Sequence, residues 1–301
     1  MEERLKNTPP RLGFIGTGLM GSAIVERLLK TGHKPVIWNR EPEMLEPLKD
    51  MGARVGASPA DVAASCDIVF LCVLDAKAVE EVVFCTNGVC ESGGNDKVLV
   101  DHSTISPGET RRMAGMLREK TGMDWVDAPI SGGPPFARDG RLTIMAGGSQ
   151  TTFARVDPIM SEYGRNRTLM GPTGAGQMTK VINQAVCGVG YVMMAEILRL
   201  AELSGIDSAR IPQCLAGGHA DSTMLQVIYP RMAGRQFEPP ASLARQMLKD
   251  LRGVLEEGQA LAVELPLVSV AEERFDQFVA GGGGMAETAS IYRLYNPNCE
   301  G

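Results

Sequence analysis

The chain has 301 residues, which is enough to bury one large hydrophobic core or two ordinary ones. A hydrophobic content of 44% and a charged content of 22% are those of a globular protein, not of a disordered one. Its 36 acidic and 30 basic residues give a net charge of −6, which argues against a nucleic-acid-binding surface. An anionic substrate would therefore have to be attracted by local cations.

The sequence lacks the signals of a membrane or secreted protein. No apolar run approaches the ~20 residues needed to span a bilayer, and the polar segment before Arg11 lacks the apolar core of a signal peptide. The seven cysteines are scattered and include no CxxC pair, so they indicate reduced thiols in place of a disulfide framework or a metal site. We expect a cytoplasmic protein that holds no metal and binds neither nucleic acid nor a membrane.

Short apolar runs alternate with amphipathic stretches through the first half of the chain. Buried strands are predicted at residues 12–15, 35–38, 68–74, 98–101, 124–127, 142–146 and 167–170. Helices are predicted at residues 19–30 and 42–51, and a capping serine at Ser106, a proline at Pro107 and an acid at Glu109 mark the start of another. This rhythm predicts parallel βαβ units with right-handed crossovers.

The pattern changes around Gly171 and Pro172. Helical periodicity then runs through residues 174–203, and further helical segments are predicted at residues 208–216, 222–233, 242–262 and 267–280. The fold class is therefore α/β, a Rossmann-like doubly wound sheet followed by an all-helical C-terminal domain. We place the α/β domain at residues 1–172 and the helical domain at residues 173–301. Its first helix, ~30 residues and ~45 Å long, is expected to bridge the two domains.

A glycine-rich segment follows the first predicted strand and opens the first predicted helix. Gly16, Gly18 and Gly21 match the GxGxxG pattern, in which they allow a tight turn, the approach of a pyrophosphate, and close packing of helix on strand. The phosphates would bind to free N–H groups at the helix N-terminus. The candidate cofactor-binding residues here are Gly16, Thr17, Gly18, Leu19, Met20 and Gly21. The alternative is a plain glycine turn.

The end of the second predicted strand bears on the choice between NAD and NADP. Enzymes that use NAD usually place an acid there to bind the ribose 2′-hydroxyl, whereas an arginine suits the 2′-phosphate of NADP. This chain has Asn39 and Arg40 at that position, and no acid at the tip. A guanidinium can bind the phosphate as a fork and stack on adenine. We expect NADP to be preferred and NAD to be less favoured, the alternative being a solvated loop arginine.

Four further segments occur in a fixed order after the glycine motif. They are DHSTISP at residues 101–107, DAPISGG at 127–133, GAGQMTKVINQ at 174–184 and LKDL at 248–251. With the glycine motif they resemble the β-hydroxyacid dehydrogenase family, which includes 3-hydroxyisobutyrate dehydrogenases and tartronate semialdehyde reductases. The resemblance covers residues 11 to about 280, and it implies the same fold and an oxidoreductase activity on a small β-hydroxy acid.

The predicted chemistry follows from the residue types of the third segment. Oxidation of an alcohol removes a proton and a hydride, and the nicotinamide accepts only the hydride. Lys180 is therefore the expected general acid and base, with a pKa lowered by burial or by a neighbouring cation. Asn183 and Gln184, three and four residues later, share its helical face and are expected to bind the substrate. An Asn-Gln pair here resembles the tartronate semialdehyde reductases of the family.

The other motifs supply further candidates. Ser131, Gly132 and Gly133 would offer a hydroxyl and main-chain N–H groups to a substrate carboxylate, and Ser131 is also a catalytic candidate. The resemblance implies that Thr104 and the Leu74 backbone contact the cofactor, and that Lys249 reaches it from the other domain. These residues also have alternative roles without function. A Ser-Gly-Gly segment can be a turn, and Lys249 and Asp250 can form an ordinary ion pair at the surface.

Several functions stay open on the sequence alone. Our first choice is an NADP-dependent tartronate semialdehyde (2-hydroxy-3-oxopropionate) reductase, followed by 3-hydroxyisobutyrate dehydrogenase and by succinic semialdehyde or glyoxylate reductase. A 6-phosphogluconate-type enzyme would need a longer C-terminal half, and imine reductases replace the lysine. From another class, a non-catalytic NADP-binding scaffold would lose Lys180. Ser242 stands where many relatives have phenylalanine, which favours a polar substrate unless a neighbour fills the gap. We expect a homodimer or homotetramer, and the role of residues 281–284 stays open.

Overall fold

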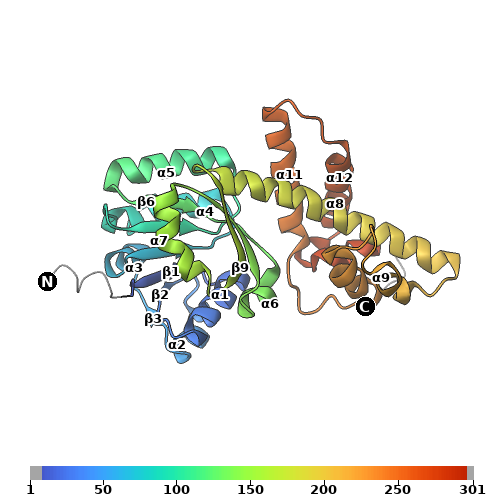
Figure 1. Cartoon of the computed structure of the whole chain (residues 1–301), viewed down its shortest axis with the longest axis horizontal. Helices are drawn as coiled ribbons and strands as arrows, with labels where there is room; N and C mark the ends of the chain where they lie inside the picture. Colours follow the sequence, from blue (N-terminus) through green and yellow to red (C-terminus); the bar gives the residue numbers. More distant parts are fainter. Residues whose placement is uncertain (1–8, 297–301) are drawn as a thin grey trace. The chain divides into compact units, whose positions relative to one another are not determined.

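A computed structural model describes residues 9–296 of the chain (Figure 1). They form two compact units, of which the first ends at Lys180 and the second begins at Val181. The strands of the first unit are β1 (Leu12–Ile15), β2 (Val36–Trp38), β3 (Arg54–Val55), β4 (Ile68–Leu71), β5 (Val98–Asp101), β6 (Asp124–Asp127), β7 (Ile130–Ser131), β8 (Leu142–Gly147) and β9 (Gly164–Gly171). Its helical segments are α1 (Leu19–Lys30), η2 (Pro42–Met44), α2 (Glu46–Asp50), α3 (Pro59–Ser65), α4 (Ala76–Phe84), η3 (Val89–Ser92), α5 (Pro107–Thr121), α6 (Gly133–Arg138) and α7 (Gln150–Met160).

The sheet has the order β3-β2-β1-β4-β5-β6-β8-β7, and β9 pairs with β8. The strands from β3 to β6 are parallel, whereas β8 runs antiparallel to β6 and β7. Alternate side chains of the central strands enter different clusters: Phe14 and Phe70 pack in one, and Ile15 and Leu71 in the other. Strands covered on both faces are continuously apolar, which is why these runs could be recognised in the sequence. The predicted Rossmann-like fold is confirmed.

The second unit is helical. Its elements are the greater part of α8 (Ala175–Ser204), then η4 (Ser208–Arg210), α9 (Ile211–Leu215), the π-helical η5 (Met224–Ile228), α10 (Tyr229–Ala233), α11 (Ala244–Ala260), α12 (Pro266–Ala280), η6 (Gly283–Met285) and η7 (Thr288–Leu294). Between Val181 and Asn296 the described chain contains no strand, and one isolated bridge joins Leu243 to Glu287. Its core includes Leu198, Tyr229, Leu251, Phe275 and Tyr292. The predicted all-helical second half is confirmed.

Several predicted bounds were wrong. The strand predicted at 68–74 ends at Leu71, because the chain leaves the sheet there and Leu74 is half exposed. The helix predicted at 42–51 is interrupted at Leu45, between η2 and α2. The segment predicted at 167–170 is part of the longer β9, which starts at Gly164 with exposed polar residues. The two-residue strands β3 and β7 were missed, because two residues are too few to show a period.

Two further features of the sequence have a structural explanation. By length and composition α8 could cross a membrane, which the sequence reading did not anticipate. However, Gln177, Lys180 and Gln184 are buried within α8 and hydrogen-bond to other parts of the chain, as in the core helix of a globular protein. Two glycines after α12 have different roles: Gly282 has a φ of 94°, a turn conformation that favours glycine, and a Cβ at Gly283 would lie 2.6 Å from the Phe278 ring.

Candidate active site

The turn between β1 and α1 is built from glycines for steric reasons. Gly16 has a φ of 90°, and a Cβ there would overlap the Cys72 carbonyl. A Cβ at Gly21 would overlap the carbonyl of Gly16, so α1 packs too close to the turn for any side chain. At Gly18, by contrast, no heavy atom lies within 4 Å of the Cβ position. The backbone at Gly18 therefore faces open space, as the approach of a phosphate requires.

The first turn of α1 has the properties of an anion site. Its N-cap Gly18 makes no side-chain cap, so the first N–H groups of this 12-residue helix are left for a ligand. Thr17 is fully buried and its hydroxyl has no partner among the described residues. Leu19 is half exposed and Met20 partly buried beside it. An orphaned buried hydroxyl next to bare helix N–H groups fits a dinucleotide pyrophosphate.

The end of β2 is joined to this turn by Asn39. The Thr17 N–H donates to Asn39 Oδ1 at 2.9 Å, and Asn39 Nδ2 donates to Glu41 Oε2 at 3.0 Å. Arg40 Nε donates to Glu41 Oε1 at 2.9 Å. The Arg40 guanidinium holds the pKa of Glu41 below its ordinary value. Glu41 was missed by the sequence reading, because the rule looks for an acid at the strand tip and this one comes later.

The loops after β4 and β5 lie at the same edge of the sheet as the glycine turn. β1, β4 and β5 are parallel neighbours, so their carboxyl ends meet there. The Val73 N–H donates to Ser103 Oγ at 3.0 Å, which ties the loop containing Leu74 to the loop containing Thr104. Leu74 is 49% exposed and Thr104 is partly buried. The cofactor candidates of the first unit are thus gathered along one edge.

Lys180 lies next to the predicted substrate loop. The residue is 7% exposed, and Nζ donates to the Ile130 carbonyl at 2.8 Å. Ser131 is the next residue, and Gly132 and Gly133 follow with φ angles of 131° and 78°. Both glycines therefore adopt backbone conformations that other residues rarely tolerate. The structure brings the amine together with the Ser-Gly-Gly segment, although they are about fifty residues apart in sequence.

The first turn of α8 is held by two residues that the sequence reading missed. Asp127, at the end of β6, accepts hydrogen bonds from the main-chain N–H groups of Gly174 at 2.8 Å and Gln177 at 3.0 Å. Gln177 Nε2 donates to the Ser103 carbonyl at 2.7 Å, and its Oε1 accepts from the Ile105 N–H at 3.3 Å. These bonds fix the helix less than one turn before Lys180. The signal that could have identified Asp127 is its place as the first residue of the DAPISGG segment.

Asn183 and Gln184 follow Lys180 on α8 and belong to the second unit. Asn183 Nδ2 donates to Gln184 Oε1 at 2.7 Å, and Gln184 Nε2 donates to Asp250 Oδ2 at 2.6 Å. Lys249 Nζ lies 3.2 Å from Asp250 Oδ1, so Lys249 makes the ion pair considered as its alternative role. The hydroxyl of Ser242 is 2.7 Å from that of Thr288, a neighbour that already satisfies it.

Two titratable groups at the end of β5, Asp101 and His102, are buried without a direct part in the predicted chemistry. Burial raises the pKa of Asp101 to about 7, and the charge of Asp127 adds to this effect. Asp101 Oδ1 accepts from the Ser103 N–H at 2.9 Å, whereas Oδ2 is buried with no partner described. Burial lowers the pKa of His102 to about 4, and its ring bonds to the Ala128 carbonyl and the Tyr163 hydroxyl. His102 is thus a neutral core residue.

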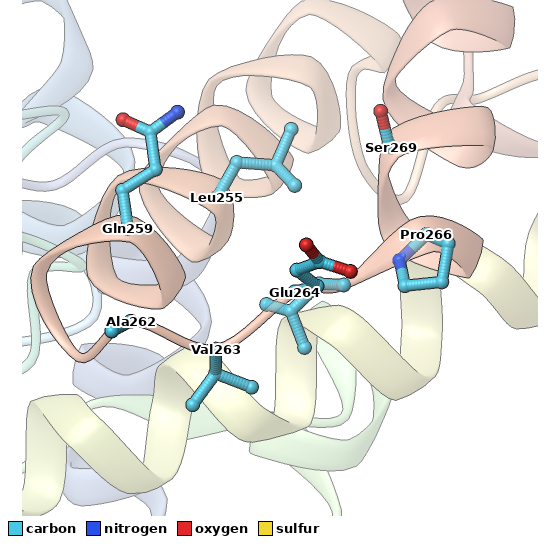
Figure 2. A pocket seen from close by; sticks show the side chains of 8 residues that line it. Leu255, Gln259, Ala262, Val263, Glu264, Pro266 and Ser269 are labelled. Carbon is cyan, nitrogen blue, oxygen red and sulfur yellow. The ribbon is translucent and has the colours of Figure 1, made fainter.

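A hollow of about 590 Å³ lies where α11 turns into α12 (Figure 2). It is lined by Leu255, Gln259, Ala262, Val263, Glu264, Leu265, Pro266 and Ser269. None of the predicted site residues belongs to this lining. Lys180 and Ser131 lie elsewhere, where Nζ of Lys180 contacts the Ile130 carbonyl.

Known protein families match both halves of the chain. Residues 11–171 match the model of the NAD-binding domain of 6-phosphogluconate dehydrogenase, and residues 174–295 match the model of the NAD-binding region of NADP-dependent 3-hydroxyisobutyrate dehydrogenase. The chain is 38% identical over 281 residues to the 2-hydroxy-3-oxopropionate reductase of Escherichia coli K12, covering 93% of this chain and 95% of that one. The chain belongs to the β-hydroxyacid dehydrogenase family. It is therefore an oxidoreductase, and its first unit binds a pyridine nucleotide.

Two other relatives mark the range of this family. The crystal structure of 3-hydroxyisobutyrate dehydrogenase from Salmonella typhimurium has a TM-score of 0.84 and 27% identity, covering 94% of this chain and 99% of that one. The human cytokine-like nuclear factor N-PAC is 31% identical over 289 residues, which cover 96% of this chain and 52% of that protein. The segment similar to this chain thus makes up about half of that longer protein.

Proposed function

We propose that this β-hydroxyacid dehydrogenase is an NADP(H)-dependent reductase of tartronate semialdehyde (2-hydroxy-3-oxopropionate), with Lys180 as general acid and base. The observation that carries the proposal is the buried Lys180 amine, 2.8 Å from the Ile130 carbonyl and adjacent to Ser131. The 38% identity to a 2-hydroxy-3-oxopropionate reductase supports the choice of substrate. The Asn183–Gln184 pair supports it as well.

Lys180 performs the proton transfer in this mechanism. In the direction of reduction its ammonium donates a proton to the oxygen of the substrate carbonyl, and in oxidation the neutral amine takes the proton of the hydroxyl. Lys180 is buried, and the Ile130 carbonyl accepts a hydrogen bond from Nζ that fixes its position. When bound, the nicotinamide nucleotide supplies or accepts the hydride.

The remaining candidates bind and orient the reactants. Ser131, with the main chain of Gly132 and Gly133, is proposed to bind the substrate carboxylate. Asn183 and Gln184 orient the substrate oxygen from the same face of α8 as Lys180. The cofactor would be held by Gly16, Thr17, Gly18, Leu19, Met20, Gly21, Asn39, Arg40, Leu74, Thr104 and Lys249. Arg40, 75% exposed at the end of β2, is the proposed partner of the 2′-phosphate, and NADP is therefore preferred over NAD.

The assembly is proposed to be a homodimer or homotetramer in the cytoplasm, without nucleic acid or membrane as a partner. Five apolar side chains of α8 are exposed and recur at intervals of three, four or seven residues, which places them on one face: Ile182, Val186, Met193, Leu200 and Leu203. A soluble monomer rarely exposes so much contiguous apolar surface. Light scattering at micromolar concentration checks the assembly, and a monomer there would contradict it.

A turnover assay tests the function directly. NADPH oxidation is followed with tartronate semialdehyde, methylmalonate semialdehyde, succinic semialdehyde and glyoxylate as substrates. The proposal predicts the highest kcat/KM for tartronate semialdehyde. A preference for methylmalonate semialdehyde would point to 3-hydroxyisobutyrate dehydrogenase instead. Binding of NADPH without turnover of any substrate would favour the non-catalytic scaffold.

A further inference from the structure

The carboxylate of Glu41 contacts both side chains that end β2. Its Oε1 accepts from Arg40 Nε at 2.9 Å, and its Oε2 accepts from Asn39 Nδ2 at 3.0 Å. Glu41 therefore occupies one donor of the guanidinium that is proposed to bind the 2′-phosphate of NADP. It does so at the surface, where the side chains of Arg40 and Glu41 are 75% and 48% exposed.

The surroundings of Arg40 are acidic. From Asn39 to Glu46 the chain has the single cation Arg40 and three acids, Glu41, Glu43 and Glu46. Glu41 is the main cause of the raised pKa of Arg40, and Glu81 and Asp75 add smaller effects of the same sign. Glu46 lies 3.3 Å from Lys49 and Glu81 lies 3.9 Å from Lys77, so these two acids have cationic partners of their own. Glu41 is the acid that pairs with Arg40.

We propose that Glu41 is a second cofactor-selectivity residue, which opposes Arg40 and moderates the preference for NADP. The proposal rests on the proposed role of Arg40. Glu41 competes with the 2′-phosphate for the guanidinium, since a carboxylate and a phosphate use the same donors. It also accepts a hydrogen bond from the 2′-hydroxyl of the unphosphorylated cofactor, as acids near this position do in NAD-binding folds.

Asn39 limits the rearrangement that this competition requires. Its Oδ1 accepts from the Thr17 N–H of the glycine turn at 2.9 Å, a bond that does not involve Glu41. When a phosphate draws Arg40 away from Glu41, Asn39 keeps its place against the turn. The exchange is therefore confined to two exposed side chains, whose ion pair is weak enough to break.

Binding titrations separate this inference from the activity of the enzyme. The dissociation constants of NADP⁺ and NAD⁺ are measured by calorimetry for the parent, Glu41→Gln, Arg40→Gln and the double variant. Glutamine keeps the shape of Glu41 and removes its charge. Glu43→Gln is the matched control, because Glu43 is an exposed acid two residues later and none of the contacts described for Arg40 or Asn39 involves it.

The expected result is a change of selectivity that depends on Arg40. Glu41→Gln should bind NADP⁺ threefold to tenfold more tightly and NAD⁺ several-fold more weakly than the parent. In the Arg40→Gln background, removal of the Glu41 charge should leave the affinity for NADP⁺ within about twofold, because the competition acts through the guanidinium. Glu43→Gln should keep the parental ratio of the two constants.

Three results would overturn the inference. An unchanged ratio in Glu41→Gln, with normal binding of both nucleotides, would sink it and leave the proposed function standing. An equal effect of Glu43→Gln would show that the general negative charge of this segment, and not the contact between Glu41 and Arg40, sets the selectivity. A parent that binds neither nucleotide would overturn the proposed cofactor together with this inference.

Discussion

The Nζ atom of Lys180 lies 2.8 Å from the carbonyl oxygen of Ile130, in a position from which water is largely excluded. Ile130 belongs to the short strand β7 that runs into Ser131. One hydrogen bond therefore connects the helix that carries the amine to the loop that is proposed to carry the substrate. A small shift of either element would alter the distance between base and substrate.

Replacement of Lys180 by Ala is expected to lower kcat about a hundredfold or more, in line with the size of general acid–base effects. The dissociation constant of the nucleotide should stay within about twofold, because the predicted cofactor contacts lie on other elements. Lys180→Met, which keeps most of the volume, should behave in the same way if the proton transfer is lost and the packing is not. Steady-state kinetics and a nucleotide titration check both. Turnover within a few-fold of the parent would show that another group is the base.

Replacement of Arg40 by Asp is expected to reverse the cofactor preference. The variant removes the one cation at the end of β2 and places a second acid beside Glu41, which favours a ribose 2′-hydroxyl over a phosphate. The measurement is the ratio of kcat/KM for NADPH and NADH in parent and variant. Equal values for the two cofactors in the parent protein would contradict the proposed role of Arg40.

Replacement of Asp127 by Asn tests whether the first turn of α8 positions Lys180. Asparagine turns one of the two acceptors into a donor that faces a main-chain N–H group, so the Gly174 or Gln177 bond is lost. We expect kcat to fall about tenfold and the free energy of unfolding to fall by about 1–3 kcal/mol. The nucleotide dissociation constant should hardly change.

Asp124 provides the control for that experiment. It lies at the start of the same strand β6, and its Oδ2 accepts from the Thr152 hydroxyl at 2.8 Å, at the other end of the strand from α8. Asp124→Asn should therefore leave kcat unchanged. If both variants lose activity equally, the effect of Asp127 is one of general stability.

The buried Asp101 predicts a specific pH dependence of stability. Its pKa is raised by burial from 3.8 to about 7, so the folded protein holds the proton more tightly than the unfolded chain. Stability from this group is complete below pH 4 and is lost as the pH rises through 7. Asp101→Asn lacks this loss. The difference in free energy of unfolding between variant and parent should therefore rise by about 2 kcal/mol in favour of the variant between pH 5 and pH 7. From pH 7 to pH 8 the difference should stay nearly constant.

Urea denaturation at pH 5, 6, 7 and 8 checks this difference. His102, with a pKa lowered to about 4, acts in the opposite sense below pH 6.5, but it does so in both proteins and cancels in the comparison. Parallel profiles of unfolding free energy against pH for parent and variant would contradict the prediction. They would mean that ionisation of Asp101 does not destabilise the folded protein.

The sequence was most informative where a side chain acts through its own chain neighbours. The buried strands, the glycine turn and the position of Lys180 on a helix all follow from local patterns. Asp127 could not be assigned in this way, because its carboxylate bonds to N–H groups 47 and 50 residues later. Glu41 was not predicted, because the rule for NAD and NADP considers the residue at the end of the second strand. Glu41 comes later in the chain, and its side chain folds back toward that end. Strand β3 has two exposed residues, and no apolar pattern could show it.

The boundary between the two compact units falls inside an unbroken helix, between Lys180 and Val181. This placement restricts insertions and deletions in α8. A loop tolerates insertions, but one residue added between Lys180 and Asn183 would turn all later side chains by about 100° around the axis of α8 relative to the amine. Substitutions along this helix keep that geometry, whereas insertions do not. Recombination between relatives at this junction would succeed only where the residue count from Lys180 onward is kept.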